Sequence, residues 1–227
     1  MSILIQAAGK NIVIDAGPDF RQQMLRAGVS HLDAVILTHE HNDHMIGIDD
    51  VRPFNFKQKE DIPVYAVERV QKDLKLRFEY VFSENKYPGA PSLALRNIYK
   101  NETFEIKGLE FIPIEVIHGK LPVLGFRIGD FTYITDARTI ASEEMAKIKG
   151  TKILILNALH YYDHYSHFNV PQALEVIKKL KPERAFLTHV SHHMGLASEI
   201  NKILPANVKL AYDQQVIEIE RGKRPTK

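Results

Sequence analysis

The sequence predicts a layered α/β fold in a single domain that spans residues 1–227. Short apolar runs with strand character alternate with helical patterns along the whole chain, with no repeat or low-complexity segment between them. A chain of 227 residues that is 44% hydrophobic and 26% charged also has the size and composition of one compact domain.

The strands are expected where apolar residues run together or alternate with polar ones, and several of these runs end in polar residues. The candidates are ILIQ, NIVID, AVILT, PVYAV, EFIPIEVI, VLGFRIG, FTYIT, KILIL, RAFLT and VIEIE. Gly129-Asp130 between VLGFRI and FTYIT predicts a hairpin. Antiparallel pairs are therefore expected beside strand-helix-strand units, and a purely parallel sheet is disfavoured.

The helices are expected between these strands, most of them closed by residues that end a helix. They are 19–27 closed by Gly28, 68–82, 142–149 closed by Gly150, and 171–180 closed by Lys181-Pro182.

Composition limits the chemistry and the compartment. The chain has no cysteine, so a metal has to be held by His, Asp or Glu. No apolar run approaches the roughly 20 residues of a membrane helix, and the opening MSILIQAAGK lacks the layout of a secretory signal, so we expect no membrane contact and a cytoplasmic protein. A formal charge of +2 does not indicate nucleic-acid binding.

Four side chains that can bind a metal directly follow the apolar run AVILT. They are His39, His41, Asp43 and His44. A loop after a buried strand can turn several side chains toward one point above the sheet. Imidazole and carboxylate groups suit zinc, manganese or iron, and the spacing suits two adjacent ions better than one. The alternative, a polar loop with histidines there by chance, is disfavoured by this density.

Three further candidates occupy the same kind of position. His118 follows EFIPIEVI, Asp136 follows FTYIT, and His189 follows RAFLT. Taken singly, His118 or His189 could be a hydrogen-bonded structural histidine, and Asp136 could cap the next segment. The repeated placement favours one shared metal site.

The segment THEHNDH resembles the HxHxDH signature of metallo-β-lactamase-fold hydrolases. NIVIDAGPD, VIHG, YITDAR and FLTHVSH are similar to the flanking motifs in the same order, over nearly the whole chain. The resemblance implies an αββα sandwich. The ligands it implies are His39, His41 and His118 for one ion, Asp43, His44 and His189 for the other, and Asp136 as a bridge. Asp15 would orient the ligand loop from behind.

The all-His/Asp ligand set is similar to the phosphodiesterase and glyoxalase branches, not to the zinc β-lactamases, which use a cysteine. HGKLPVLGF, LHYYDHYSHFNV and FLTHVSH most resemble the phosphoribosyl cyclic phosphodiesterase group of the carbon-phosphorus lyase pathway. This resemblance implies a phosphodiesterase for a small cyclic or nucleotide-like phosphodiester. Two divalent ions, Zn²⁺ or Mn²⁺ with iron as an alternative, would activate a hydroxide.

Asp43 and His167 are the residues expected to be catalytic, Asp43 as a ligand as well. The resemblance places His167 where a catalytic histidine of the phosphodiesterases lies, and a non-ligand imidazole suits protonation of the leaving alkoxide. The alternative is that His160, His164 and His167 form an exposed loop with their polar tips in water.

Two residues are candidates for contact with the substrate. Arg52 could reach a phosphate through its guanidinium group, although pairing with Asp49 or Asp50 is slightly favoured. For His160, substrate contact and simple exposure are both open.

The chain departs from the family in two features. The usual first strand and a cysteine-rich loop that binds a structural zinc are missing, and His192 matches the histidine ligand of that zinc without its thiolate partners. An unpaired sheet edge and a lost structural metal would make stability depend on a partner, so we expect a homodimer. A shortened chain or a late start codon would explain the same observation.

Three other functions compete with a phosphodiesterase of small molecules. A tRNA 3′-end processing nuclease shares the ligands, but the long basic arm that would grip tRNA is not evident, so nucleic acid is not the favoured substrate. A glyoxalase-type thioester hydrolase would not be expected to share HGKLPVLGF and SHFN. A truncated, non-catalytic binding module is disfavoured by the intact ligand set.

Overall fold

The computed structural model describes residues 2–219. The chain divides into two compact units, residues 1–109 and residues 110–227, and each has its own sheet and its own hydrophobic core. The single functional domain expected from the sequence stays a prediction. No helix among the described residues is long and apolar enough to cross a membrane.

The first unit is built on a five-stranded sheet in the order β1-β2-β3-β4-β5. The strands are β1 Ile3–Ala7, β2 Lys10–Ile14, β3 Ala34–Ile36, β4 Ile62–Ala66 and β5 Leu93–Asn97, and β6 Phe104–Ile106 follows them in the chain. β1 pairs antiparallel with β2, whereas β2, β3, β4 and β5 are parallel. The carboxyl ends of β2 and β3 therefore lie at one edge of this sheet.

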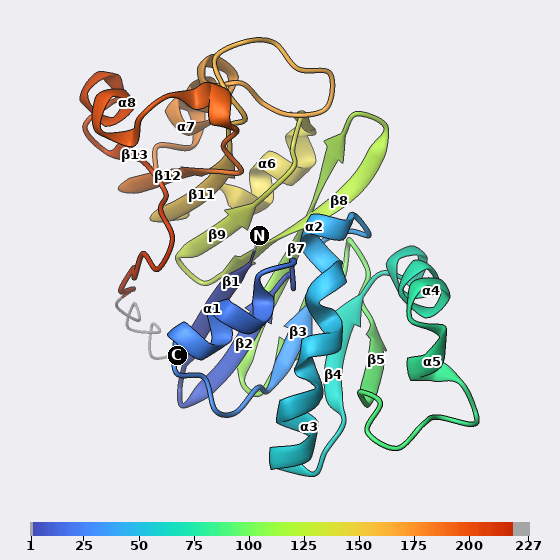
Figure 1. Ribbon diagram of the computed structural model, residues 1–227. Coiled ribbons are helices and arrows are strands. Elements are labelled where there is room, and N and C mark those ends of the chain that lie inside the picture. The colour runs from blue at the N-terminus through green and yellow to red at the C-terminus, as the bar shows by residue number, and fades with distance from the viewer. Residues whose placement is uncertain (1, 220–227) are drawn as a thin grey trace, which may run out of the picture. The chain divides into compact units, whose positions relative to one another are not determined.

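Helices pack on one face of this sheet, with α1 and α3 in front of the strands in Figure 1. The elements are α1 Phe20–Arg26, α2 Asn42–Met45, the 3₁₀ helix η1 Ile46–Val51, α3 Arg52–Gln58, α4 Glu68–Arg77 and α5 Glu79–Phe82. Val70 and Leu74, one helical turn apart on α4, are buried in the same core as Val35 and Val64 of the sheet.

The second unit contains a mixed sheet whose strand order is β10-β7-β8-β9-β11-β12-β13. The strands are β7 Leu109–His118, β8 Leu121–Ile128, β9 Phe131–Ile134, β10 Thr139–Ile140, β11 Ile153–Asn157, β12 Arg184–Thr188 and β13 Val208–Leu210. β7, β8 and β9 are antiparallel neighbours, and β9, β11, β12 and β13 are parallel. Strands β7, β9, β11 and β12 thus all end at the same edge.

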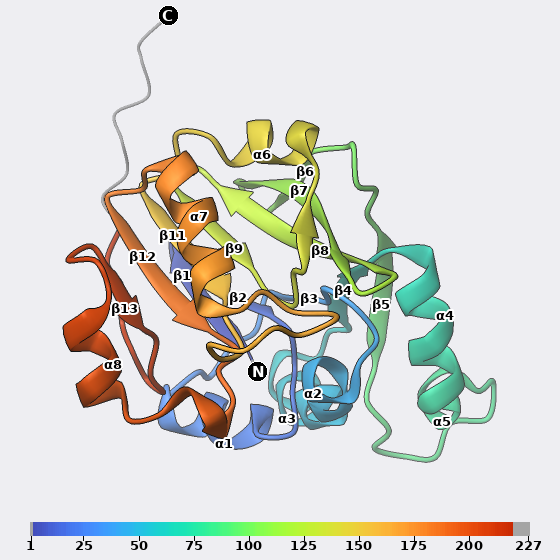
Figure 2. The ribbon, with the colours of Figure 1, turned by 90° about the horizontal axis from the view of Figure 1, so that it is seen from above.

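Helices cover this sheet as well, and Figure 2 shows α7 lying across β11 and β12. The helices are α6 Ser142–Ile148, α7 Val170–Leu180, the 3₁₀ helix η2 His192–Met194 and α8 Ala197–Ile203. A capping box begins α7: Gln172 N donates to Asn169 Oδ1 at 2.9 Å, and Asn169 N donates to Gln172 Oε1 at 3.1 Å.

Most of the expected elements are confirmed, and the differences have physical reasons. Gly129-Asp130 does join two antiparallel strands, with Gly129 at a positive φ of 57°. The helix expected over 68–82 is interrupted at Phe78, which is buried and leaves the helical region at ψ 45°. β5, β6, β10 and β13, and the helices α2, α3 and α8, were not expected.

The strand expected at VIEIE is wrong for residues 216–219, which are not in a strand, and Glu220 lies outside the described residues. The alternation of apolar and charged residues there fits a strand period. However, Val216 and Ile219 are exposed, so a strand here would gain no stability from burying an apolar face.

The backbone of Gly47, just after the ligand segment, packs closely against the turn that follows β2. Gly47 N donates to Ala16 O at 2.9 Å, and a Cβ on Gly47 would lie 2.1 Å from Gly17 O. Any side chain would push η1 away from the turn that follows β2.

We therefore expect Gly47→Ala to lower the free energy of unfolding by about 1–3 kcal/mol, as overpacking does in a tight interior. Urea denaturation measures this loss, with Gln22→Ala, at an exposed position of α1, as a control that changes stability by less than about 0.5 kcal/mol. Equal stability of Gly47→Ala and the wild type would contradict the close approach.

Candidate metal centre

The ligand segment of the first unit, residues 39–44, follows β3 and runs into α2. Its donor atoms lie in two pairs. His39 Nε2 lies 3.0 Å from His41 Nδ1, and His44 Nε2 lies 3.1 Å from Asp43 Oδ2. A spacing of 3.0 Å between two nitrogens is within reach of one ion bound at about 2.0–2.1 Å from each. The segment thus offers a donor pair for each of two ions.

The buried carboxylate of Asp15 fixes this segment from behind. Asp15 Oδ1 accepts from Thr38 N at 2.8 Å, and Oδ2 accepts from Thr38 Oγ1 at 2.9 Å and from His44 Nδ1 at 2.7 Å. Because His44 donates through Nδ1, its lone pair is on Nε2. Thr38 Oγ1 in turn lies 2.9 Å from His39 Nδ1, which favours the same tautomer for His39.

Helix α4 holds the residues that alternate with the ligands. Arg69 forms an ion pair with Glu40, whose side chain is largely buried, and Arg77 donates to Asn42 Oδ1. Arg77 Nε also donates to Asp73 Oδ2 at 2.5 Å on its own helix. Arg69 and Arg77, at the two ends of α4, therefore restrain the ligand segment at Glu40 and Asn42.

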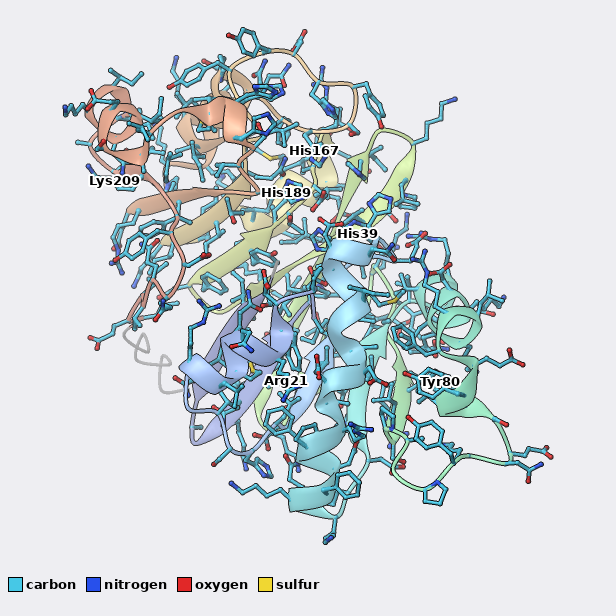
Figure 3. The ribbon with its side chains drawn as sticks, viewed as in Figure 1. Arg21, His39, Tyr80, His167, His189 and Lys209 are labelled. Atoms are coloured by element: carbon cyan, nitrogen blue, oxygen red, sulfur yellow. The ribbon has the colours of Figure 1, made fainter. Side chains whose placement is uncertain are left out.

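The second unit gathers four candidate residues at the edge where its strands end. His189 Nε2 lies 3.1 Å from Asp136 Oδ1, and His167 Nδ1 lies 3.6 Å from the same oxygen. His118 Nδ1 donates to Ser166 O at 2.8 Å, which leaves the lone pair of His118 on Nε2. Figure 3 shows His167 and His189 side by side, with ring centroids 4.8 Å apart.

Three of these polar residues have a left-handed backbone that non-glycine residues rarely adopt. The φ angles are 64° for Asp15, 58° for Asp136 and 54° for His189, each directly at or just after a strand end. Asp136 is further fixed by Thr135 Oγ1, which donates to Asp136 Oδ2 at 2.5 Å. Strained residues of this kind cluster at functional sites, because surrounding bonds have to compensate for their cost.

His167 differs electrostatically from an ordinary surface histidine. Burial lowers the pKa of His167 to about 4, the negative charge of Asp136 opposes this, and the imidazoles of His189, His118 and His164 lower it further. His167 Nδ1 is buried and has no hydrogen-bond partner among the described residues. At neutral pH the ring is therefore uncharged.

The histidine loop, residues 159–169, joins β11 to α7. The alternative of an exposed loop is wrong for His160 and His167, which are only 9% and 8% exposed. His160 Nδ1 donates to Tyr162 O at 3.0 Å, so one ring nitrogen of this candidate substrate contact is already engaged within the loop. Burial lowers the pKa of His164 too, with the imidazoles of His160 and His118 adding to the effect.

The residues present fit divalent metal ions. His118 and Asp136 each offer a donor atom, and these two atoms lie within 4.8 Å of one another. His39, His44 and His118 all present Nε2 with Nδ1 engaged behind them, an arrangement typical of histidines that bind metals.

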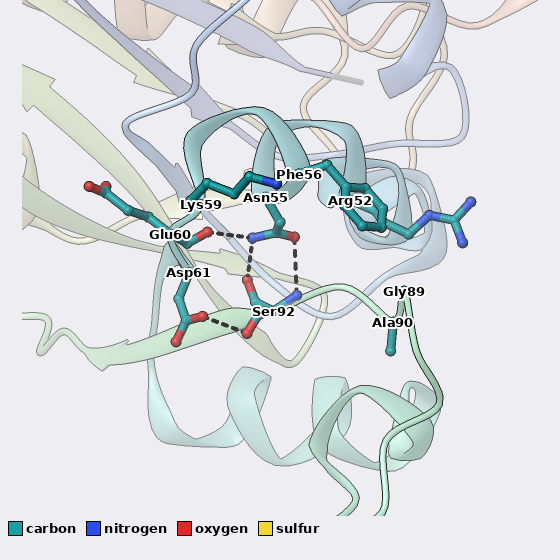
Figure 4. Close-up of a pocket in the computed structure, with 9 residues that line it drawn as sticks. All are labelled: Arg52, Asn55, Phe56, Lys59, Glu60, Asp61, Gly89, Ala90 and Ser92. Carbon is teal, nitrogen blue, oxygen red and sulfur yellow. Dashed lines mark hydrogen bonds between the residues drawn. The ribbon is translucent and has the colours of Figure 1, made fainter.

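Arg52 lines a hollow of about 240 Å³ in the first unit (Figure 4), beside Phe56, Lys59 and Ser92. Lys59 and Ser92 precede β4 and β5, whereas the ligand segment follows the parallel strand β3, so this part of the hollow lies at the opposite edge of the sheet. Within residues 2–219 Arg52 forms no ion pair with Asp49 or Asp50. Contact between Arg52 and the substrate stays a prediction.

His192 is exposed in η2, and its ring lies 3.8 Å from that of His193. Nothing in this placement assigns a metal to His192. Sequence reasoning missed Glu40, Arg69 and Arg77. Only Glu40 had a signal, its position between two ligand histidines, whereas the arginines lie 29 and 35 residues beyond their partners.

We expect Arg69→Ala to weaken metal binding by about tenfold, because Glu40 would lose its partner and the ligand segment its restraint. Chelator competition measures the affinity. Lys72→Ala is the matched control, since Lys72 on the same helix pairs with exposed Glu68. Unaltered metal affinity in Arg69→Ala, with a normal melting temperature of the metal-free protein, would contradict the restraint.

Comparison with known proteins agrees with this geometry. Residues 10–190 match the family described as the beta-lactamase superfamily domain. A Porphyromonas gingivalis protein named octanoyltransferase is 40% identical over 224 residues, 98% of this chain and 45% of that protein. A ribonuclease Z of Methanosarcina mazei is 28% identical over 123 residues, 52% of this chain and 35% of that protein. The chain spans less than half the length of these curated relatives.

Among solved structures, a crystal structure described as a new diphosphatase from the PhnP family matches with a TM-score of 0.87 and 36% identity. The match covers 93% of this chain and 80% of that chain. The metallo-β-lactamase fold expected from the sequence motifs is thereby confirmed. The chain belongs to the beta-lactamase superfamily, has the metallo-β-lactamase fold and is similar to a diphosphatase of the PhnP family.

Proposed function

We propose that this chain is a metal-dependent phosphodiesterase acting on a small cyclic or nucleotide-like phosphodiester. The observation that carries the proposal is the arrangement of donor atoms in residues 39–44, one pair from His39 and His41 and another from Asp43 and His44. Two adjacent cations suit a phosphate group, which can offer one oxygen to each ion, better than a carbonyl group. The relatives named diphosphatase and ribonuclease Z, whose names denote chemistry at phosphorus, support the same substrate class.

The ligand set in this proposal is the one that the family resemblance implies. It consists of His39, His41 and His118 for one ion, Asp43, His44 and His189 for the other, and Asp136 as a bridge. Zn²⁺ or Mn²⁺ would lower the pKa of a bound water toward neutrality and offset negative charge on the phosphate.

The remaining chemistry falls to His167. A phosphodiester anion next to this imidazole would raise its pKa from the low value that burial imposes, because nearby negative charge favours imidazolium. A water-derived hydroxide would form the new P–O bond. As the bond to the leaving oxygen breaks, the protonated ring would donate its proton to that oxygen and return to its neutral form. Asp136 Oδ1 lies 3.6 Å from His167 Nδ1, beyond hydrogen-bond distance, so its negative charge favours the protonated ring without a direct bond.

The similarity to a protein named octanoyltransferase does not favour acyl transfer here. This chain matches 45% of that protein, and it contains no cysteine thiol that could carry an acyl group. We infer that the activity in that name belongs to the part of the relative that this chain does not match. A homodimer stays a prediction, which light scattering can test.

The direct test is hydrolysis of bis(p-nitrophenyl) phosphate by metal-loaded protein, with metal content measured in the same samples. We expect Asp43→Ala to lose metal together with activity. His167→Ala should keep its metal, but its kcat should fall by about 10²–10⁴-fold, the usual contribution of a general acid. His31→Ala, at an exposed histidine beside Asp33, is the control that keeps both.

The proposal would be contradicted if the wild-type protein bound two ions per chain and still left the diester intact. Full activity of His167→Ala would remove His167 from the mechanism while leaving the metal-dependent reaction in place.

A further inference from the structure

The histidine loop is held firmly although much of it faces solvent. Phe168 N donates to Ala137 O at 2.7 Å, and Ser191 N donates to Leu159 O at 2.9 Å, which ties both ends to neighbouring strand ends. In its middle, Asp163 Oδ1 accepts from Asn169 Nδ2 at 3.1 Å and from Gln172 Nε2 at 3.0 Å. The conformation of the loop is thus set before any ligand arrives.

The three tyrosines of the histidine loop are exposed, whereas two of its histidines are buried. Tyr161 is 36% exposed, Tyr162 71% and Tyr165 83%, while His160 and His167 are buried. Tyrosine offers a large flat face at low cost in conformational entropy, which makes it a frequent binding residue. Exposed tyrosines on a rigid loop beside a catalytic histidine are therefore candidates for contact with a substrate.

Tyr165 is the one placed next to the proposed reaction centre. Atoms Cδ2 and Cε2 of its ring lie 3.7 Å from where a Cβ of Gly119 would be, and Gly119 directly follows the ligand His118. The next residue, Ser166, accepts from His118 Nδ1 through its carbonyl oxygen. On its other side, the Tyr165 ring lies 4.8 Å from His164, which in turn lies 5.1 Å from His167.

Tyr162 has a different setting on the same loop. Its ring lies 5.7 Å from His160, and its carbonyl oxygen accepts from His160 Nδ1. No contact with His118, Gly119 or His167 is present for Tyr162 among the described residues. The two tyrosines thus form a matched pair, both exposed and on one loop, of which only Tyr165 borders the ligand His118.

We propose that Tyr165 forms a stacking subsite for a flat aromatic ring of the substrate, such as a nucleobase linked to the reacting phosphate. The inference rests on the proposed phosphodiesterase function and narrows its substrate class to ring-bearing phosphodiesters. Stacking on an aromatic side chain accepts any base, since every base has a π face, so Tyr165 selects for a ring and not for a particular base.

The test is calorimetric binding of AMP and of ribose 5-phosphate to the metal-loaded protein, because these probes share a phosphate and a ribose and differ in the ring. We expect the wild type to bind AMP about tenfold more tightly than ribose 5-phosphate. Tyr165→Ala should remove that difference while leaving the affinity for ribose 5-phosphate unchanged. Tyr165→Phe, which keeps the flat face, and Tyr162→Ala should both preserve it.

Equal affinity of the wild type for the two probes would overturn the subsite. A tenfold preference for AMP that survives Tyr165→Ala would do the same, as would the absence of AMP binding. Calorimetry needs no turnover, so these results are independent of the hydrolysis assay. Failure of hydrolysis would contradict the phosphodiesterase, whereas failure here would leave it standing with a substrate that lacks a stacked ring.

Discussion

The buried carboxylate of Asp15 is the constraint on which the ligand segment of the first unit depends. It accepts hydrogen bonds from the backbone and the hydroxyl of Thr38 and from His44 Nδ1, and so joins the end of β2 to the end of β3 and to α2. A charge in this position is stable only because it is fully hydrogen-bonded. The same bonds choose the ring tautomers that place the lone pairs of His39 and His44 on Nε2.

A common rule governs both units: polar residues that follow apolar strands gather at one sheet edge. In the parallel pair β11 and β12, the last residues of the two strands, Asn157 and Thr188, lie opposite each other, so the two strands end side by side. The left-handed conformations of Asp136 and His189 then turn these side chains at the strand ends instead of letting the strand continue. Local strain and the ladder hydrogen bonds therefore act together, the ladder compensating for the strain.

Much of this could be predicted from the sequence because the signals are local. The apolar run AVILT is followed by histidines, and FTYIT is followed by Asp136. Each pattern predicts both a strand and a polar residue just after its end. Other features depend on tertiary contacts that leave no local pattern. Arg69 meets Glu40 only because α4 packs beside the ligand segment, and VIEIE has a strand's alternation but no sheet to join.

The orientation of side chains in the histidine loop could not be predicted from the sequence either. Its sequence alternates His with Tyr, and this pattern alone gave no means of telling which type turns inward. Hydrogen bonds from Phe168 and Ser191 settle the orientation, and they bury His167 beside Asp136 while Tyr165 stays in solvent. In the proposed mechanism, the buried imidazole of His167 transfers the proton and the exposed ring of Tyr165 binds the substrate.

The measurement that tests the central claim most directly is the number of metal ions bound per chain. It is made by elemental analysis of the wild type, His41→Ala and Asp43→Ala, after loosely bound metal has been removed. Two ions in the wild type, with one lost in each variant, is the result that the two donor pairs predict. A single ion in the wild type, lost completely in both variants, would contradict a two-ion centre.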